Sequence, residues 1–130
     1  MSLPKPKNLL NVQDVICQIA VRTAEYLNAC LIIVITETGY TARVLAKCRP
    51  KQTILALCMS ASVIRQLKIA RGVATLKIPS FLGSENLINQ SIMYAKESGS
   101  IKAGDKIVCL LGENEETPDY VNVMKITTVV

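Results

Sequence analysis

The sequence predicts an α/β domain, a three-layer α/β/α sandwich around a five-stranded, mostly parallel sheet whose last strand is antiparallel. Several apolar runs lack alternation, which is typical of strands covered on both faces. Segments with helical periodicity lie between those runs, so strands and helices alternate. The last two runs are joined only by the polar segment ENEETPD, which is too short for a parallel crossover. These three features together predict the fold.

The chain begins with a segment that we expect to lie outside the domain. Residues 1–10 include MSLPKPKN, whose proline and lysine content is typical of a linker, and we place the domain at residues 11–130. The first helix is predicted over residues 11–28, with Asn11 as its N-cap and Asp14 in its first turn. Its predicted apolar stripe consists of Val12, Val15, Ile16, Ile19, Tyr26 and Leu27.

The next predicted elements are a central strand, a short helix and a second strand. ACLIIVIT (residues 29–36) is continuously apolar and is expected at the centre of the sheet. A helix over residues 41–48 follows and ends before Arg49-Pro50, because the residue preceding proline disfavours helix. TILALCMS (residues 53–60) is the second buried strand.

The second half of the chain continues the alternation. Ser60 or Ser62 caps a helix that extends to Ala70, and Gly72 ends that segment in a left-handed conformation. VATLKIP is the third strand, and Ser84 is the expected cap of a fourth helix ending near residue 98. The expected inward residues of this helix are Leu87, Ile88, Ser91, Ile92 and Ala95.

The tail contains the last two strands. IKAGDKIVCLLG comprises a turn and a strand, and YVNVMKITTVV is the final strand. We expect this exposed apolar strand to pair with a second copy of the chain across a two-fold axis.

Composition limits the chemistry that the chain can perform. Half of its 130 residues are hydrophobic but only 4% are aromatic, which predicts one aliphatic core. No apolar run approaches the roughly 20 residues of a membrane span, so we expect a soluble, cytoplasmic domain without a membrane partner. The chain has no histidine and no CxxC pair, so we expect neither a metal site nor a catalytic residue. The cysteines are expected to pack as small apolar residues at positions Cys17, Cys30, Cys48, Cys58 and Cys109.

The net charge of +5 is unevenly distributed. No acidic residue lies between Glu37 and Glu85, whereas eight basic residues do. A basic surface could face nucleic acid, but these cations are single and have no interleaved aromatic residues for base stacking. We therefore favour solvated helix faces and subunit contacts over nucleic-acid binding.

The segment after the predicted central strand is the candidate anion site. It contains Thr36, Glu37, Thr38, Gly39, Tyr40 and Thr41. Three hydroxyls, a glycine and the start of a helix are features that bind phosphate, although no Walker or GxGxxG motif is present. The alternative is that one threonine caps the helix and Gly39 makes the turn. A cap needs one hydroxyl, however, and the segment has three.

Several segments of the chain resemble the C-terminal domain of pyruvate kinase. That family has a strand, a T-x-[ST]-G-x-[ST]-A loop, a short helix, an Arg-Pro pair and a second strand, as in ITETGYTARVLAKCRPKQTILALC. The later segments ARGVATLKIP, SGSIKAGDKIVCLLGE and NVMKITTV are also similar to that domain. The matching residues of the first segment are Thr36, Thr38, Gly39, Thr41, Ala42, Arg49, Pro50, Ile54 and Ala56.

The resemblance implies a parent enzyme of glycolysis that transfers phosphate from phosphoenolpyruvate to ADP with Mg²⁺ and K⁺. In the family a separate barrel domain performs this chemistry, so the fragment itself is expected to be non-catalytic. Its implied roles are tetramer assembly, contact with the rest of the pyruvate kinase chain, and binding of a phosphate-bearing effector. The alternative is a stand-alone sugar-phosphate or anion-binding module with the same fold.

Two departures from the family pattern argue against fructose 1,6-bisphosphate as the effector. Family members that bind it commonly have a non-acidic residue at the position of Glu37. The second effector loop, where the family has Trp and Arg, is acidic here and consists of Glu113, Asn114, Glu115 and Glu116. A carboxylate about 4 Å from a phosphate costs about 1 kcal/mol in water and more when partly buried. We therefore expect the chain not to respond to this effector.

Overall fold

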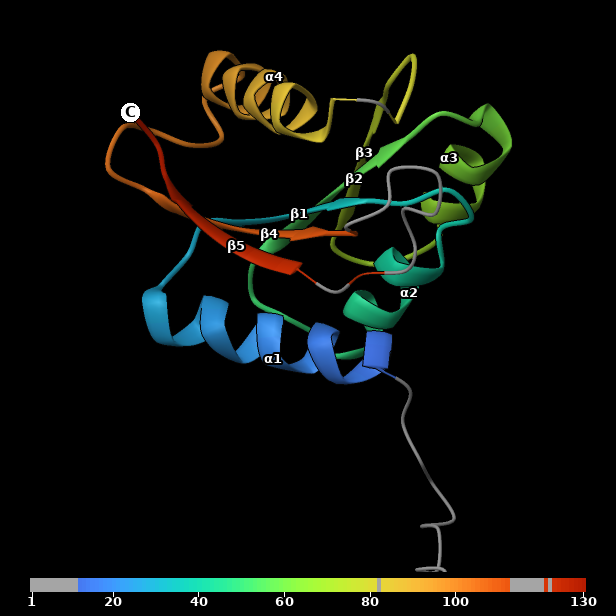
Figure 1. The fold of residues 1–130 in the computed structure, drawn as a ribbon, viewed down its shortest axis with the longest axis horizontal. Helices are drawn as coiled ribbons and strands as arrows, with labels where there is room; N and C mark the ends of the chain where they lie inside the picture. Colours follow the sequence, from blue (N-terminus) through green and yellow to red (C-terminus); the bar gives the residue numbers. More distant parts are fainter. Residues whose placement is uncertain (1–11, 82, 113–120, 122) are drawn as a thin grey trace, which may run out of the picture.

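The computed structural model describes residues 12–81, 83–112, 121 and 123–130, so the predicted linker (residues 1–10) and the predicted cap Asn11 lie outside the described residues. The elements alternate as the sequence predicts (Figure 1). The helices are α1 (Val12–Leu27), α2 (Tyr40–Lys47), α3 (Ala61–Leu67) and α4 (Ser84–Glu97). The strands are β1 (Leu31–Ile35), β2 (Thr53–Cys58), β3 (Val73–Lys77), β4 (Lys106–Leu111) and β5 (Val123–Thr128).

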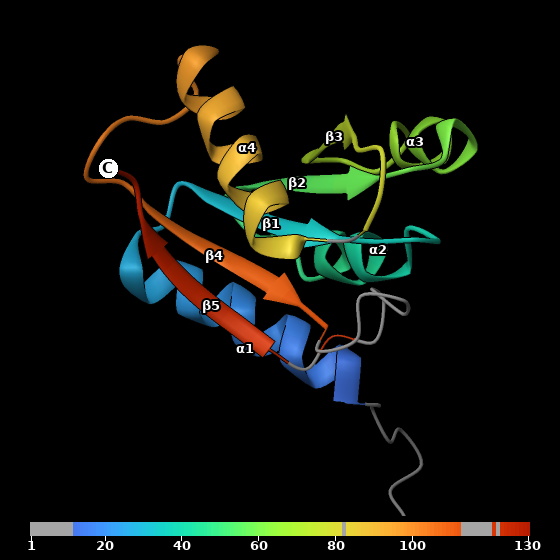
Figure 2. The same cartoon turned by 45° about the horizontal axis from the view of Figure 1, so that its top comes forward.

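The five strands form one sheet in the order β3-β2-β1-β4-β5. The first four are parallel, and β5 runs antiparallel to β4 with Lys106 opposite Thr128 (Figure 2). Strand β1 lies in the middle of the sheet, and each of its residues is buried. The predictions of a central first strand and an antiparallel last strand are both confirmed.

Helices cover both faces of the sheet, which confirms the three-layer sandwich. Helices α1 and α2 lie on one face and α4 lies on the other (Figure 1). Alternate residues of β1 belong to two separate cores. Ile32 and Val34 pack with α1, α2 and α3. Leu31, Ile33 and Ile35 pack with α4. A continuous apolar strand is therefore required at this position.

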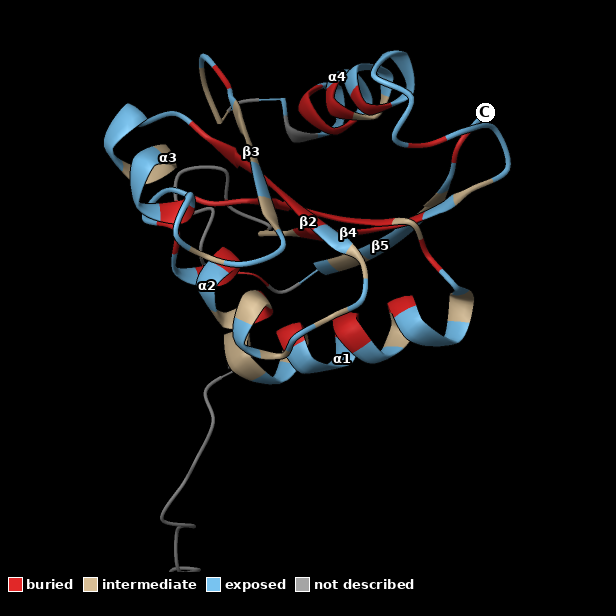
Figure 3. Ribbon diagram, turned by 180° about the vertical axis from the view of Figure 1, so that it is seen from behind, coloured by how far each residue is buried: buried red, intermediate tan, exposed pale blue. Residues whose placement is uncertain are grey.

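The predicted apolar stripe of the first helix is wrong at three of its positions, although Ile16 is partly buried and packs against the core as predicted. Val15, Ile19 and Tyr26 are 41%, 49% and 86% exposed. The buried face of α1 consists of the smaller residues Cys17, Ala20, Val21 and Ala24 (Figure 3). These residues also have helical i, i+3, i+4, i+7 spacing, and their small side chains allow the helix to approach the sheet closely. Val15, Ile19 and Tyr26 are therefore left on the outer face of α1.

The helix boundaries differ from the predictions in small ways. Of the two proposed caps of α3 the structure uses Ser60, whose hydroxyl accepts the Val63 N–H at 3.4 Å. The helix ends at Leu67 rather than Ala70, although Gly72 has the predicted left-handed conformation with φ +79°. The cap of α4 is Gly83 rather than Ser84, because the chain turns there through φ +73°.

The inward face of α4 is predicted correctly, since Leu87, Ile88, Ser91 and Ala95 are buried. Cys17, Cys58 and Cys109 are buried, and all five cysteines are free thiols. Burial raises the pKa of the Cys17 thiol to about 12 and that of Cys109 to about 11. These thiols are therefore protonated at neutral pH and pack as apolar groups. Among the described residues, no helix combines the length and the apolar character that crossing a bilayer requires.

Candidate functional site

The threonine loop (residues 36–41) connects the carboxyl end of β1 to the start of α2. Gly39 is the N-cap of α2 and has φ +85°, a conformation that residues with a Cβ rarely adopt. A Cβ at this position would lie 3.1 Å from Arg43 Nη1 and 3.3 Å from Leu67 Cδ2 and Val63 Cγ1. Glycine is thus required both by the turn and by the close contact with α3.

The loop uses its own hydroxyls and amides to build this turn. The Gly39 N–H donates to Thr36 Oγ1 at 2.8 Å, and the Tyr40 N–H donates to Thr38 Oγ1 at 3.3 Å. Arg43 Nη1 donates to the Thr38 carbonyl at 3.2 Å. Two of the amides that a bound anion would need at the start of α2 therefore already have acceptors.

The three hydroxyls are not equally accessible. Thr36 and Thr41 have no exposed surface, whereas Thr38 is exposed. The exposed residues of the loop are thus Glu37, Thr38 and Tyr40. The structure brings all six predicted residues to the carboxyl edge of the sheet, but the surface that they present includes one carboxylate and only one of the threonine hydroxyls.

The second predicted effector loop, Glu113, Asn114, Glu115 and Glu116, lies outside the described residues. The neighbouring strands nevertheless define where it starts. β4 pairs with β1, with Leu110 opposite Val34, and ends at Leu111. The carboxyl end of β4 therefore lies at the same edge of the sheet as the threonine loop.

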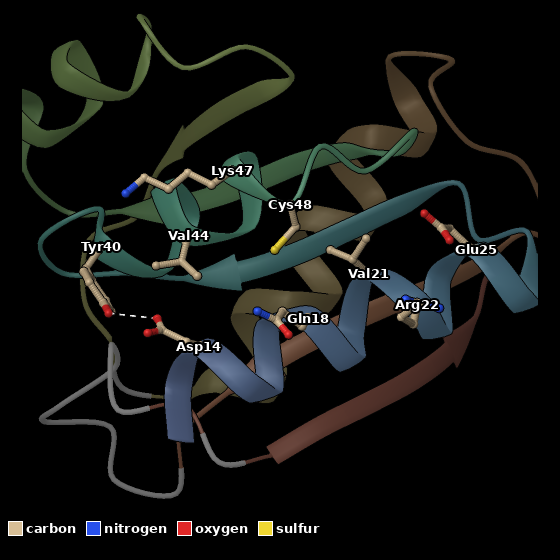
Figure 4. Close-up of a pocket in the computed structure, with 9 residues that line it drawn as sticks. All are labelled: Asp14, Gln18, Val21, Arg22, Glu25, Tyr40, Val44, Lys47 and Cys48. Carbon is tan, nitrogen blue, oxygen red and sulfur yellow. Dashed lines mark hydrogen bonds between the residues drawn. The ribbon is translucent and has the colours of Figure 1, made fainter. Parts of the chain in front are cut away.

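Tyr40 links the threonine loop to the first helix. Its hydroxyl donates to Asp14 Oδ1 at 2.9 Å, beside a groove of about 580 Å³ between α1 and α2 (Figure 4). This groove was not predicted from the sequence, because the wrong face of α1 was assigned to the core. The groove is lined by Asp14, Gln18, Val21, Arg22, Glu25, Tyr40, Val44, Lys47 and Cys48.

The charges that line this groove balance. Its lining includes two acidic residues, Asp14 and Glu25, and two basic residues, Arg22 and Lys47. Burial is the main cause that raises the pKa of the Cys48 thiol, and the charge of Asp14 adds to it. The groove therefore offers neither a net preference for anions nor a reactive thiolate.

A second groove, of about 550 Å³, lies at the opposite edge of the sheet, where β2 and β3 begin. The Arg49-Pro50 pair, which was interpreted from the sequence as a helix stop and as part of the family resemblance, forms part of its wall. No local motif could have revealed this groove, since its residues come from two separate connections. They are Ala46, Arg49, Pro50, Gln52, Ile54, Arg71 and Gly72.

The model of the pyruvate kinase α/β domain family matches residues 14–127 of the chain. The chain belongs to this family. The pyruvate kinase of Eimeria tenella is 42% identical over 120 residues, which cover 92% of this chain and 23% of that protein. The pyruvate kinase of Dictyostelium discoideum is 32% identical over 129 residues, covering 99% of this chain and 25% of that protein.

Solved structures agree with this assignment. A pyruvate kinase from Cryptosporidium parvum superposes with a TM-score of 0.87 at 42% identity, over 96% of this chain and 24% of that chain. The pyruvate kinase of the same organism in complex with ADP gives a TM-score of 0.86 at 41% identity, over 98% of this chain and 25% of that chain. The resemblance to the pyruvate kinase C-terminal domain is confirmed. The chain spans about a quarter of the length of these relatives.

Proposed function

We propose that this pyruvate kinase C-terminal domain assembles and regulates a cytoplasmic, tetrameric glycolytic enzyme that converts phosphoenolpyruvate and ADP to pyruvate and ATP. The domain would occupy residues 11–130 and contact the rest of the pyruvate kinase chain. The described residues bring no three His, Cys, Asp or Glu side chains together as a metal site. In this proposal the Mg²⁺ and K⁺ of the parent enzyme are not bound by this domain.

The observation that carries the assembly role is the apolar outer face of α1. Val15, Ile19 and Tyr26 lie at positions i, i+4 and i+11, so they form one stripe on the side of the helix away from the sheet. A surface helix of a monomer normally has polar residues on this side. Contact with a second copy of the chain would remove the stripe from water.

Strand β5 offers a second contact surface. It lies at the end of the sheet, and Val123 and Ile126 are 37% and 49% exposed. An edge strand has unpaired N–H and C=O groups along one side, and a second β5 related by a two-fold axis would supply partners for them.

Sedimentation of the 130-residue chain tests the assembly role. We expect self-association at high concentration, and we expect Ile19→Lys or Ile126→Lys to weaken it at least about tenfold by placing a charge in an apolar contact. Met93→Lys is the matched control, because Met93 is an exposed apolar residue of α4 and belongs to neither α1 nor β5. A chain that remains monomeric at high concentration would contradict the assembly role.

The regulatory role would not involve fructose 1,6-bisphosphate. The support for this proposal is the exposed Glu37 in a loop whose Thr36 and Thr41 side chains are buried. In calorimetric titration we expect no micromolar binding of this bisphosphate. Glu37→Gln should raise its weak affinity about fivefold, since removing one nearby charge is worth about 1 kcal/mol. Micromolar binding to the unaltered chain would refute the proposal.

A further inference from the structure

We propose that the arginine groove, lined by Arg49, Gln52 and Arg71 at the amino ends of β2 and β3, binds a small phosphomonoester that also carries a hydroxyl group. This site lies at the opposite edge of the sheet from the threonine loop, so it goes beyond the function proposed above. Three observations support it: the convergence of two arginines, the lack of carboxylates around them, and one buried acceptor without a donor.

The chain brings the two arginines together through the pairing of β2 with β3. After α2, Arg49 adopts φ +51°, and Pro50 prevents the helix from continuing. On the neighbouring connection Gly72, with φ +79°, places Arg71 just before β3. The Ile54 N–H donates to the Gly72 carbonyl at 2.9 Å, which holds the starts of the two strands side by side. Arg49 and Arg71 consequently line the same groove.

The two guanidinium groups are available to a ligand. None of the described residues that line the groove is acidic, and the sequence has no acidic residue between Glu37 and Glu85. Among the described residues, neither guanidinium has a hydrogen-bond acceptor or a carboxylate within ion-pair distance. A guanidinium offers a planar set of N–H donors that matches the oxygens of a phosphate, and two of them can contact one phosphate together.

Gln52 indicates what else the ligand must carry. Its Nε2 donates to the Ala24 carbonyl at 3.3 Å. This bond sets the orientation of the amide, because a carbonyl can only accept. The other amide atom, Oε1, is then buried with no donor among the described residues. A buried acceptor without a partner is unfavourable, and because Gln52 lines the groove, a ligand hydroxyl would supply the missing donor once the side chain turned Oε1 toward it.

The size of the groove is consistent with a small molecule. Its volume is about 550 Å³, which is within the usual range of small-molecule sites. Inorganic phosphate would contact only the arginines, whereas the phosphomonoester of a polyol would also reach Gln52. The ligand class that fits both requirements is a hydroxylated phosphomonoester.

Calorimetric titration of the 130-residue chain tests this proposal with glycerol 3-phosphate, inorganic phosphate and glycerol. We expect glycerol 3-phosphate to bind several times more tightly than phosphate, and glycerol alone not to bind. Arg49→Gln and Arg71→Gln should each lower the affinity for glycerol 3-phosphate at least about tenfold, which is the effect of losing one charge-assisted hydrogen bond. Gln52→Leu should abolish the preference for glycerol 3-phosphate over phosphate.

Two matched variants localise the site. Lys51→Gln removes the same charge from the same connection, but Lys51 does not line the groove, so its effect should be small. Glu37→Gln changes the threonine loop and should leave this binding unchanged. Thermal unfolding of each variant confirms that it is folded. The proposal is wrong if glycerol 3-phosphate fails to bind at millimolar concentration. It is also wrong if Lys51→Gln weakens this binding as much as the arginine variants do, or if Glu37→Gln is the one variant that alters the binding.

Discussion

The two edges of the sheet differ in how their polar groups are used. At the carboxyl edge, the threonine loop has the residue types of a phosphate site, yet Gly39 and Tyr40 donate their amides to threonine hydroxyls of the same loop. At the amino edge, the arginine groove has no recognisable motif, yet its two guanidiniums and the Gln52 Oε1 atom have no partner among the described residues. A polar binding site needs hydrogen-bonding groups that have no partner within the protein. A sequence motif does not show whether its groups already have such partners.

The largest expected difference between the two edges concerns their glycines. Gly39→Ala should lower the free energy of unfolding by about 2 to 3 kcal/mol, from the strain of a left-handed residue and the tight contacts of its new Cβ. At Gly72, a new Cβ would have no atom of the described residues within 4 Å. Gly72→Ala should therefore cost only about 1 kcal/mol, from the backbone conformation alone. Urea unfolding of both variants measures the difference.

Equal losses for the two glycine variants would show that backbone conformation alone selects glycine at both edges. The contacts of Gly39 with Arg43, Leu67 and Val63 would then contribute nothing to its selection.

The next prediction compares the buried Thr36 hydroxyl with the exposed Thr38 hydroxyl. The Thr36 hydroxyl accepts the buried Gly39 N–H, and Thr36→Val leaves that donor without its acceptor. This variant should lower the free energy of unfolding by about 1.5 kcal/mol. The Thr38 hydroxyl accepts the Tyr40 N–H at an exposed position, where water can replace it. Thr38→Val should therefore cost less than about 0.5 kcal/mol.

Chemical denaturation of the two threonine variants checks both values. A neutral Thr36→Val variant would mean that the hydroxyl is free to bind a ligand, contrary to the geometry.

The last predicted effect is on the other edge and has the opposite sign. Arg49 has a left-handed conformation at the end of α2, which glycine accepts more readily. Arg49→Gly should therefore raise the free energy of unfolding by about 0.5 kcal/mol. It should also weaken glycerol 3-phosphate binding. Arg49→Ala is the control, since it removes the guanidinium but retains a Cβ. A stability gain with unchanged binding would exclude Arg49 from the site.

The sequence was sufficient to predict most of the fold. Continuous apolar runs identified β1 and β2 as buried strands, and the short last connection predicted the antiparallel pairing of β5. The stripe of α1 was wrong at Val15, Ile19 and Tyr26 because large apolar residues were assigned to the core, whereas close packing on the sheet selects Ala20 and Ala24. The cap of α4 was wrong because the left-handed Gly83, rather than a serine hydroxyl, begins that helix.

The sites were less predictable, for physical reasons. The composition of the threonine loop was plain from the sequence, but the burial of Thr36 and Thr41 depends on packing by other elements. The arginine groove depends on residues from two connections that only the pairing of β2 with β3 brings together. Local patterns cannot report such a long-range juxtaposition.

The order of the strands also limits how far the sheet can extend. An open sheet has two edges, here β3 and β5, and either one could in principle recruit further strands. If β5 pairs with β5 of a second copy about a two-fold axis, both β5 edges become hydrogen-bonded. The two β3 strands then form the remaining open edges of the shared sheet. Strand β3 is short and ends in Lys77, a charge that discourages pairing with a further strand. Pairing of strands between chains would then stop at one continuous sheet shared by two chains. The product would be a dimer rather than a fibre.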